Sequence, residues 1–308
     1  MSEGSNTNQR VLLTGANGYI GSYIRQDPRS RNFKFLSRYK GAADQWRFLD
    51  KLSPSVDYSE HVKDIDVIIH LASSAHSYQH SLEALRAVNV DACIKLAKDA
   101  EKAGVKRFIY LSSSNVYGHA ELIEDETRVA PQTPESELRV ECEELLKQLA
   151  SETQMEVVIV RSPLVYSFDA PGNIGVLLSF IRKFKVTPFG FAKNPRSFIS
   201  VLNLVDFIFV CCNHEKAGNR AFVISDREPL SFNLLAKHLS KYGRMNMMQL
   251  PIPLPLLKLL GAITGKRNLI RQITSNSVIN TTAAKRELDW APPYSAEDAL
   301  KELYKVEK

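Results

Sequence analysis

Short apolar runs alternate with amphipathic stretches through the first half of the chain. Runs rich in Val, Ile, Leu and Phe predict buried strands, and apolar residues three and four positions apart predict helices. The predicted strands cover residues 11–13, 33–37, 46–49, 66–72, 107–112 and 156–160, and the predicted helices cover 18–26, 81–103 and 134–151. Strands that alternate with helices in this way favour an α/β fold with a doubly wound parallel sheet.

The pattern loosens after Tyr166, where glycine, proline and aromatic residues become more frequent. We therefore predict a first domain over residues 1–165 and a smaller C-terminal lobe over 166–308, with segments near 196–225 returning to the first domain. A buried helix over 201–211 and a strand over 221–225 are expected in that returning part.

Residues 251–264, PIPLPLLKLLGAIT, form an apolar stretch with repeated prolines. Two interpretations stay open for it, a helix packed on the core and a helix that lies on a membrane surface. The first is favoured, because the stretch lacks a strongly basic face.

A glycine-rich turn follows the first predicted strand, in the sequence VLLTGANGYIG over residues 11–21. A strand that ends in such a turn and opens a helix leaves backbone N–H groups directed at a pyrophosphate. Gly15 permits the tight turn, Gly18 lets the backbone approach the phosphates, and Gly21 allows close packing of helix on strand. The sequence therefore predicts a Rossmann dinucleotide site, whose loop residues are Gly15, Asn17, Gly18, Tyr19, Ile20 and Gly21.

The residue that reads the adenosine ribose belongs at the end of the second strand. An acidic residue there favours NAD, but none occurs from Phe33 to Gly41, and Arg38 can pair with the 2′-phosphate of NADP. NADP is therefore slightly favoured over NAD, although Asp44 stays open as an NAD reader. Asp50, at the end of the third strand, is a candidate contact for the adenine.

Further candidates follow the strands that come next. The strand over 66–72 ends at Leu71, Ala72 and Ser73, and small residues suit a place where a cofactor crosses the sheet edge. Asn89 is either a polar contact behind this site or a solvated side chain. The strand over 107–112 carries Leu111 to the same edge.

Composition narrows the class of ligand. The 308 residues are 44% hydrophobic and 24% charged, with 40 Lys+Arg against 34 Asp+Glu and a net charge of +6. The basic residues form no run, so nucleic-acid binding is not indicated, whereas a mild positive field suits an anionic small molecule. The four cysteines lack metal-ligand spacing, and no metal site is expected. Residues 1–9 lack an apolar signal-peptide core and no run of ~18 apolar residues occurs, so we expect a cytoplasmic protein without a membrane span.

Four segments together identify a family resemblance. VLLTGANGYIG, DVIIHLAS, VKRFIYLSSSNVYG and VIVRSPLVY stand in the order and spacing of the extended short-chain dehydrogenase/reductases. Within that family the chain resembles the NAD(P)-dependent sugar-nucleotide epimerases, dehydratases and reductases over essentially its whole length. It looks most like the C4 epimerases of UDP-N-acetylhexosamines and the reductases of UDP-4-keto-6-deoxy-hexosamines in polysaccharide biosynthesis.

The resemblance implies a catalytic serine, tyrosine and lysine, but only the serine is present. In that family the tyrosine moves a proton while hydride passes to or from nicotinamide, and a lysine one helical turn later lowers the tyrosine pKa from its usual ~10. Ser113 matches the hydroxyl that contacts the reacting oxygen. The register of residues 131–146 places Glu135 where the tyrosine belongs and Arg139 where the lysine belongs. We expect these two to form an ion pair, which would make the carboxylate a poor proton donor.

Three hypotheses follow from this substitution. The first is an active enzyme that uses Tyr117 or another group in place of the tyrosine. The second is an enzyme that uses Glu135 in altered chemistry, and the third is a protein that binds nucleotides without turnover. We favour an active enzyme, a reductase or epimerase that transfers hydride at C4 of a UDP-sugar. An atypical dehydratase is disfavoured, because Ser114-Asn115 replaces the Asp-Glu of the family's dehydratases.

The resemblance also implies substrate and partner contacts. Pro163 lies in the segment that runs beside the nicotinamide, and Asn173 and Arg196 match residues that contact the UDP diphosphate. Either Arg267 or Arg271 is a candidate second phosphate contact, and we place Arg271 in the site. Family members often dimerise through two long helices, here 81–103 and 134–151, so a homodimer is a candidate assembly.

Overall fold

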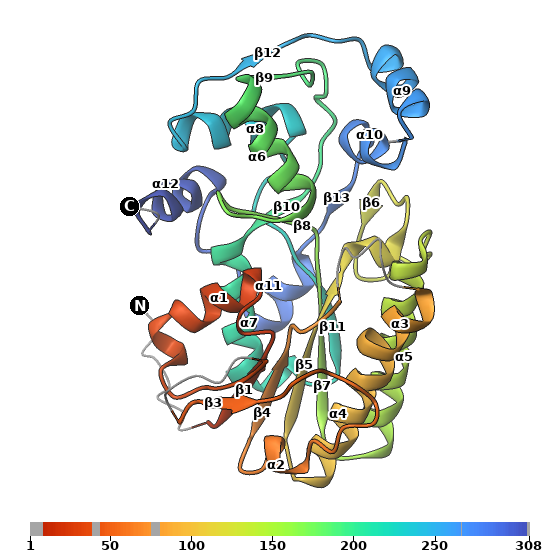
Figure 1. Cartoon of the computed structure of the whole chain (residues 1–308), viewed down its shortest axis with the longest axis vertical. Helices are drawn as coiled ribbons and strands as arrows, with labels where there is room; N and C mark the ends of the chain where they lie inside the picture. Colours follow the sequence, from red (N-terminus) through yellow and green to blue (C-terminus); the bar gives the residue numbers. More distant parts are fainter. Residues whose placement is uncertain (1–8, 39–43, 75–80, 266, 307–308) are drawn as a thin grey trace.

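The computed structural model describes residues 9–38, 44–74, 81–265 and 267–306 (Figure 1). Seven parallel strands form the central sheet, in the order β11-β7-β5-β4-β1-β2-β3. Their bounds are β1 (Val11–Thr14), β2 (Lys34–Ser37), β3 (Trp46–Phe48), β4 (Val67–His70), β5 (Arg107–Ser113), β7 (Glu156–Ser162) and β11 (Arg220–Val223). The chain starts in the middle of the sheet, winds to one edge and then returns to build the other half. This order confirms the predicted doubly wound Rossmann sheet.

Helices cover both faces of the sheet because successive strand residues point to opposite sides. Val11 and Leu13 pack into one apolar cluster and Leu12 into a second. The first cluster includes α1 (Tyr19–Gln26) and α7 (Val201–Asn213), and the second includes α2 (Ser59–Val62), α4 (Ala92–Lys102) and α5 (Pro134–Glu152). Nearly every residue of the inner strands β1, β4, β5 and β7 is therefore buried, which explains the continuous apolar runs in the sequence.

The helix expected over 81–103 is interrupted. It divides into α3 (Leu82–Arg86), a π-helical turn (Ala87–Asp91) and α4. A π-helical turn inserts one residue into the helical ladder, and apolar spacing at three and four positions does not reveal it. The helix over 134–151 is continuous, as expected.

The C-terminal lobe lies beyond the carboxyl ends of the strands (Figure 1). β8 (Leu164–Tyr166) follows β7 directly and pairs with β10 (Phe198–Ser200), while α7 and β11 belong to the central sheet layer. The short pair β9 (Val186–Thr187) with β12 (Met248–Gln249) lies within the lobe, whereas β6 (Leu122–Ile123) with β13 (Val278–Ile279) joins it to the first part of the chain. The helices of the lobe are α6 (Gly172–Phe184), α8 (Phe232–Tyr242), α9 (Leu254–Ile263), α10 (Arg267–Thr274) and α12 (Ala296–Val306), and α11 (Thr282–Leu288) packs beside β11 of the central sheet (Figure 1).

Helix α9 differs from the expected core helix. Leu257 and Gly261 are buried, but Leu256, Leu259 and Ile263 are exposed, so only one side of the helix packs on the lobe. No helix among the described residues is both long and apolar enough to cross a membrane.

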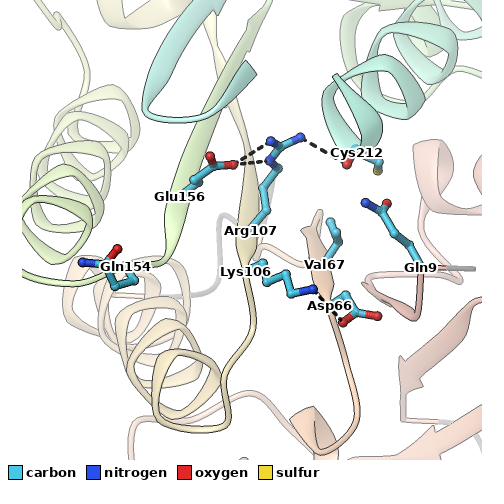
Figure 2. A pocket seen from close by; sticks show the side chains of 8 residues that line it. All are labelled: Gln9, Asp66, Val67, Lys106, Arg107, Gln154, Glu156 and Cys212. Carbon is cyan, nitrogen blue, oxygen red and sulfur yellow. Dashed lines mark hydrogen bonds and ion pairs between the residues drawn. The ribbon is translucent and has the colours of Figure 1, made fainter. Parts of the chain in front are cut away.

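A hollow of about 500 Å³ lies at the amino ends of β4, β5 and β7, opposite the glycine-rich turn (Figure 2). Arg107 pairs with Glu156 at 2.6 Å and donates to the backbone carbonyls of Cys211 and Cys212 at the end of α7. A cation at a helix C-terminus stabilises its last carbonyl groups. Structural contacts therefore hold the walls of this hollow together. The hollow lies at the amino ends of the strands, whereas the glycine-rich turn lies at their carboxyl ends.

Candidate functional site

The glycine-rich turn has the backbone geometry that a pyrophosphate requires. Gly15 has φ +74°, and a Cβ there would lie 2.8 Å from the amide nitrogen of Ala72. A Cβ on Gly21 would lie 2.1 Å from the carbonyl oxygen of Gly15, so α1 packs directly on the turn. Gly18 precedes α1 and provides no side-chain cap, and the first turn of α1 holds no acidic residue. The first N–H groups of α1 are thus left for an anion.

A buried hydroxyl fixes this turn to the end of β4. Thr14 Oγ1 accepts the amide of Ala72 at 3.2 Å and lies 3.0 Å from His70 Nδ1. Burial lowers the pKa of His70 to about 4, so the imidazole is neutral at pH 7. These contacts therefore join the ends of β1 and β4, beside the glycine-rich turn, without a charged group.

The residues expected to read the adenosine lie at the ends of β2 and β3. Asn17 Nδ2 donates to Ser37 Oγ at 2.7 Å, which joins the glycine-rich turn to the end of β2. Arg38 follows β2 directly and is exposed, and Asp50 is exposed two residues after β3. Asp44 is also exposed, just before β3.

Asn89 lies in the π-helical turn and contacts the loop after β4. Its Oδ1 accepts the amide of Ser74 at 2.7 Å, and its Nδ2 donates to the Ser74 carbonyl at 3.2 Å. It is thus a polar contact behind the site, and it positions the loop that starts at Leu71, Ala72 and Ser73.

Ser113 is the last residue of β5 and lies on the side of the sheet where the strands end and the glycine-rich turn begins. Its Oγ accepts the amide of Asn115 at 3.2 Å, so the hydroxyl proton stays available to a ligand. Tyr117, four residues later, is buried and its hydroxyl accepts from Arg161 Nη1 at 2.8 Å. Burial raises the Tyr117 pKa, which makes it a weak acid near neutrality.

A buried ion pair behind Ser113 was not among the predicted site residues. Arg161 on β7 pairs with Glu143 on α5, and Glu143 also accepts from Ser112 Oγ at 2.5 Å. Glu143 is fully buried, so removing either charge would leave the other unpaired in the core. The sequence signal was a charged residue inside an apolar strand, Arg161, together with a glutamate on the buried face of the predicted helix.

Glu135 and Arg139 do not form the expected ion pair. Glu135 is exposed in the first turn of α5, and it makes no hydrogen bond or ion pair with any residue that the structure describes. Arg139 is partly buried, and its Nη1 donates to the Leu111 carbonyl at 3.4 Å. Thr133 and Ser136 form a capping box that begins the helix between them. The guanidinium is therefore held at the end of β5, while the carboxylate stays in solvent.

The predicted diphosphate residues come together in the lobe, through a residue that sequence reasoning missed. Gln272 on α10 accepts from Asn173 Nδ2 at 2.5 Å through its side chain and from Arg196 Nη1 at 2.9 Å through its carbonyl. Arg196 has no carboxylate partner among the described residues, and burial lowers its pKa to about 10. Arg267 and Arg271 lie on the same helix as Gln272 and are exposed.

A chain of hydroxyl contacts joins the cofactor turn to the start of the lobe. Ser167 Oγ donates to Asp169 at 2.6 Å, and so it must accept the hydroxyl proton of Tyr19, at 2.6 Å. Tyr23 donates to the same carboxylate at 2.6 Å. The hydroxyl of Ser167 is therefore the link between Tyr19 on α1 and Asp169 after β8.

Comparison with known proteins places these features in a family. Residues 11–225 match the model of the NAD dependent epimerase/dehydratase family. The chain is 30% identical to the UDP-glucose 4-epimerase of Vibrio cholerae, over 95% of this chain and 93% of the relative. It is 26% identical to the N-acetyl-α-D-glucosaminyl-diphospho-ditrans,octacis-undecaprenol 4-epimerase of Escherichia coli O157:H7, over 89% and 87% of the two chains.

Solved structures agree on the fold. The crystal structure of UDP-N-acetylglucosamine 4-epimerase from Bacillus cereus superposes with a TM-score of 0.77 at 17% identity, covering 97% of this chain and 99% of that one. UDP-glucuronic acid 4-epimerase from the same organism, in complex with NAD, gives 0.76 at 17% identity over 96% of both chains. The predicted preference for NADP gains no support, since the UDP-glucuronic acid 4-epimerase structure is a complex with NAD.

Proposed function

The chain belongs to the NAD dependent epimerase/dehydratase family, and from this premise we propose that it binds NAD and transfers hydride at C4 of a UDP-sugar, as an epimerase or reductase with an atypical site. The observation that supports the sugar diphosphate is Arg196. A partly buried guanidinium without a carboxylate partner among the described residues carries a desolvation cost, and a diphosphate would offset it with bidentate hydrogen bonds. Asn173 and Gln272 add an amide group each beside it.

The described residues fit a bound dinucleotide. The uncapped N-terminus of α1 would hold the pyrophosphate, and Asn17 with Ser37 would border the adenosine. Arg139, held at the Leu111 carbonyl, would donate to the nicotinamide ribose. NAD bound there would supply the hydride acceptor and donor.

Proton transfer is assigned to one side chain and positioning to another. Ser113 would donate a hydrogen bond to the C4 oxygen of the sugar, and so hold that oxygen in place. Glu135, in the first turn of α5, would accept the proton of the C4 hydroxyl directly or through a water. Tyr117 is the less suitable base, because its hydroxyl is buried and bonded to Arg161.

A nucleotide-binding protein without turnover is the second candidate. The observation that favours it is the exposed Glu135, which no described residue orients. A base that is not held in place loses most of the advantage of a positioned catalytic group.

The test is to measure binding and turnover separately on the purified protein. UDP binding is measured by calorimetry, and turnover by chromatography of UDP-glucose, UDP-N-acetylglucosamine and undecaprenyl-diphosphate-linked N-acetylglucosamine incubated with NAD. The lipid-linked sugar is included because UDP and undecaprenyl diphosphate both carry a diphosphate that would meet Arg196. We expect UDP affinity to fall at least tenfold in Arg196→Gln and to stay unchanged in Lys305→Gln, which removes an exposed charge on α12.

The outcomes separate the two candidates. C4 epimerisation of any of these sugars, or oxidation at C4 coupled to reduction of NAD, supports the enzyme. Binding of NAD and UDP without turnover supports the binding protein, and failure of the wild type to bind UDP contradicts both.

A further inference from the structure

Helix α9 carries an apolar stripe that faces solvent. Leu256, Leu259, Leu260 and Ile263 are 47%, 56%, 44% and 73% exposed. At about 100° per residue these positions fall within an arc of about 100° on one side of the helix. The buried positions Leu257 and Gly261 lie on another side, against the lobe. Four large aliphatic side chains on one exposed face form a contiguous patch of the kind that marks an interaction site.

The stripe lies next to the diphosphate cluster. α9 packs on α10, and the two helices stand together at one end of the lobe (Figure 1). α10 holds Gln272, which contacts Asn173 and Arg196. A surface that binds α9 is therefore separated from the proposed diphosphate site by one helix.

The sequence around α9 is basic. Residues 229–286 contain nine Lys and Arg and no Asp or Glu, and residues 170–205 contain five and none. Lys258 on α9 and both Arg267 and Arg271 on α10 are exposed. An open hollow of about 420 Å³, lined in part by Lys193 and Lys237, lies beside Pro251, just before α9. Exposed cations thus lie on α9 itself and on α10, which packs against it.

We propose that α9 docks this protein on the surface of an anionic lipid bilayer. An apolar stripe among lysines and arginines matches such a surface, since the side chains enter the acyl boundary while the cations meet the headgroups. A second copy of the chain fits less well, because a symmetric contact through α9 would place residues 229–286, with nine basic and no acidic residues, against the same residues of the other copy. Docking needs only the ten residues of α9 lying on the surface, and no helix that spans it.

The experiment is vesicle flotation of the full chain without nucleotide or sugar. Vesicles of phosphatidylcholine alone are compared with vesicles that contain about 30% phosphatidylglycerol. The anionic lipid gives the second set a negative surface potential, which attracts lysine and arginine side chains. The wild type should float with the anionic vesicles at least fivefold more than with the neutral ones. The double variant Leu259→Glu with Ile263→Glu should reduce that binding at least tenfold. Ile263→Glu alone should reduce it by a smaller factor.

Leu234→Glu is the matched control, because Leu234 is an exposed leucine on α8 of the same lobe. It should float as the wild type does. Light scattering of the proteins without vesicles measures their oligomeric state and so tests the alternative that a second copy of the chain covers α9. Equal flotation of the wild type and the α9 variants, or a wild-type dimer that the α9 variants make monomeric, would overturn the proposal. UDP binding is measured apart from flotation, so loss of one does not count against the other.

Discussion

Glu135 and Arg139 stand one turn apart on α5, yet their side chains go to different places. An exposed ion pair at this spacing is worth only about 0.2–0.5 kcal/mol in a helix. A backbone carbonyl competes well with such a pair, and Arg139 donates to the carbonyl of Leu111 on β5 instead. The identities of both residues were predictable from the sequence, whereas their contacts depended on where β5 ends.

Restoring the family pair tests the role of these two positions. The double variant Glu135→Tyr with Arg139→Lys supplies a phenol and an ammonium that lowers its pKa. We expect turnover of the best UDP-sugar to rise about 10²-fold, the lower range for a positioned acid–base group. Steady-state kinetics with NAD checks this, with Arg139→Lys alone as the control. A double variant no faster than the wild type would show that the remaining site is not arranged for C4 chemistry.

Asp226 gives the molecule a pH dependence of its own. It is buried, accepts from Tyr166 at 2.6 Å and from Asn203 at 2.7 Å, and burial raises its pKa to about 6 from 3.8. Native Asp226 therefore holds its proton more tightly than unfolded Asp226 does. Its stabilising contribution is complete below about pH 4 and is lost as the pH rises through about 6.

The size of this effect can be measured. At about 1.4 kcal/mol for each pH unit, the rise corresponds to about 3 kcal/mol of unfolding free energy. In Asp226→Asn the unfolding free energy should not show this decline between pH 4 and 6.5. At other pH values its pH profile should run parallel to that of the wild type. Urea denaturation across this pH range decides it, and parallel profiles throughout would mean that Asp226 ionises normally in the fold.

At the scale of elements, the glycine-rich turn was the most predictable part of the molecule. A strand, a turn with glycine at fixed offsets and a helix must meet in one geometry, so the residues indicate it directly. The interruption of the 81–103 helix and the exposed side of α9 were not predictable in the same way. Apolar spacing indicates that a helix has an apolar face, but it does not indicate which apolar face meets the protein.

Gly15→Ala tests the turn. The Cβ would sit 2.8 Å from the Ala72 backbone and at φ +74°, so either the turn or β4 must move. We expect NAD affinity to fall at least tenfold and the melting temperature to drop. Gly104→Ala is the control, since Gly104 has φ +82° but no atom within 4 Å of the added Cβ. It should lose about 1 kcal/mol of stability from strain and keep NAD affinity, and an equal loss of affinity in both variants would argue against the role of the turn.

At the scale of the whole molecule, the order of the sheet followed from the sequence because each βαβ unit is local and right-handed. The C-terminal lobe was less predictable, since its contacts join residues far apart in the chain, as Gln272 does with Asn173 and Arg196. The same reason explains the missed network of Arg161, Glu143 and Ser112. Pairings across long sequence distances depend on the packed structure, and local spacing does not encode them.

The contact of Tyr19 with Ser167 bears on how two ligands would affect each other. One hydrogen-bonded chain joins the first residue of α1, beside the pyrophosphate turn, to the segment that opens the lobe. If NAD raises the affinity for UDP by some factor, thermodynamic linkage requires UDP to raise the affinity for NAD by the same factor. We expect a factor of about 5 or more in the wild type, the lower range for coupled sites, and a factor near 1 in Ser167→Gly.

Calorimetric titration of each ligand with and without the other measures both factors. Tyr23→Phe is the matched variant, because it removes the outer hydrogen bond to Asp169 and keeps the Tyr19–Ser167 contact. It should preserve most of the cooperativity. A serine at position 167 would then make the mutual increase in affinity of the two ligands depend on one hydroxyl group, and equal factors in the wild type and Ser167→Gly would show that this hydroxyl does not couple the two sites.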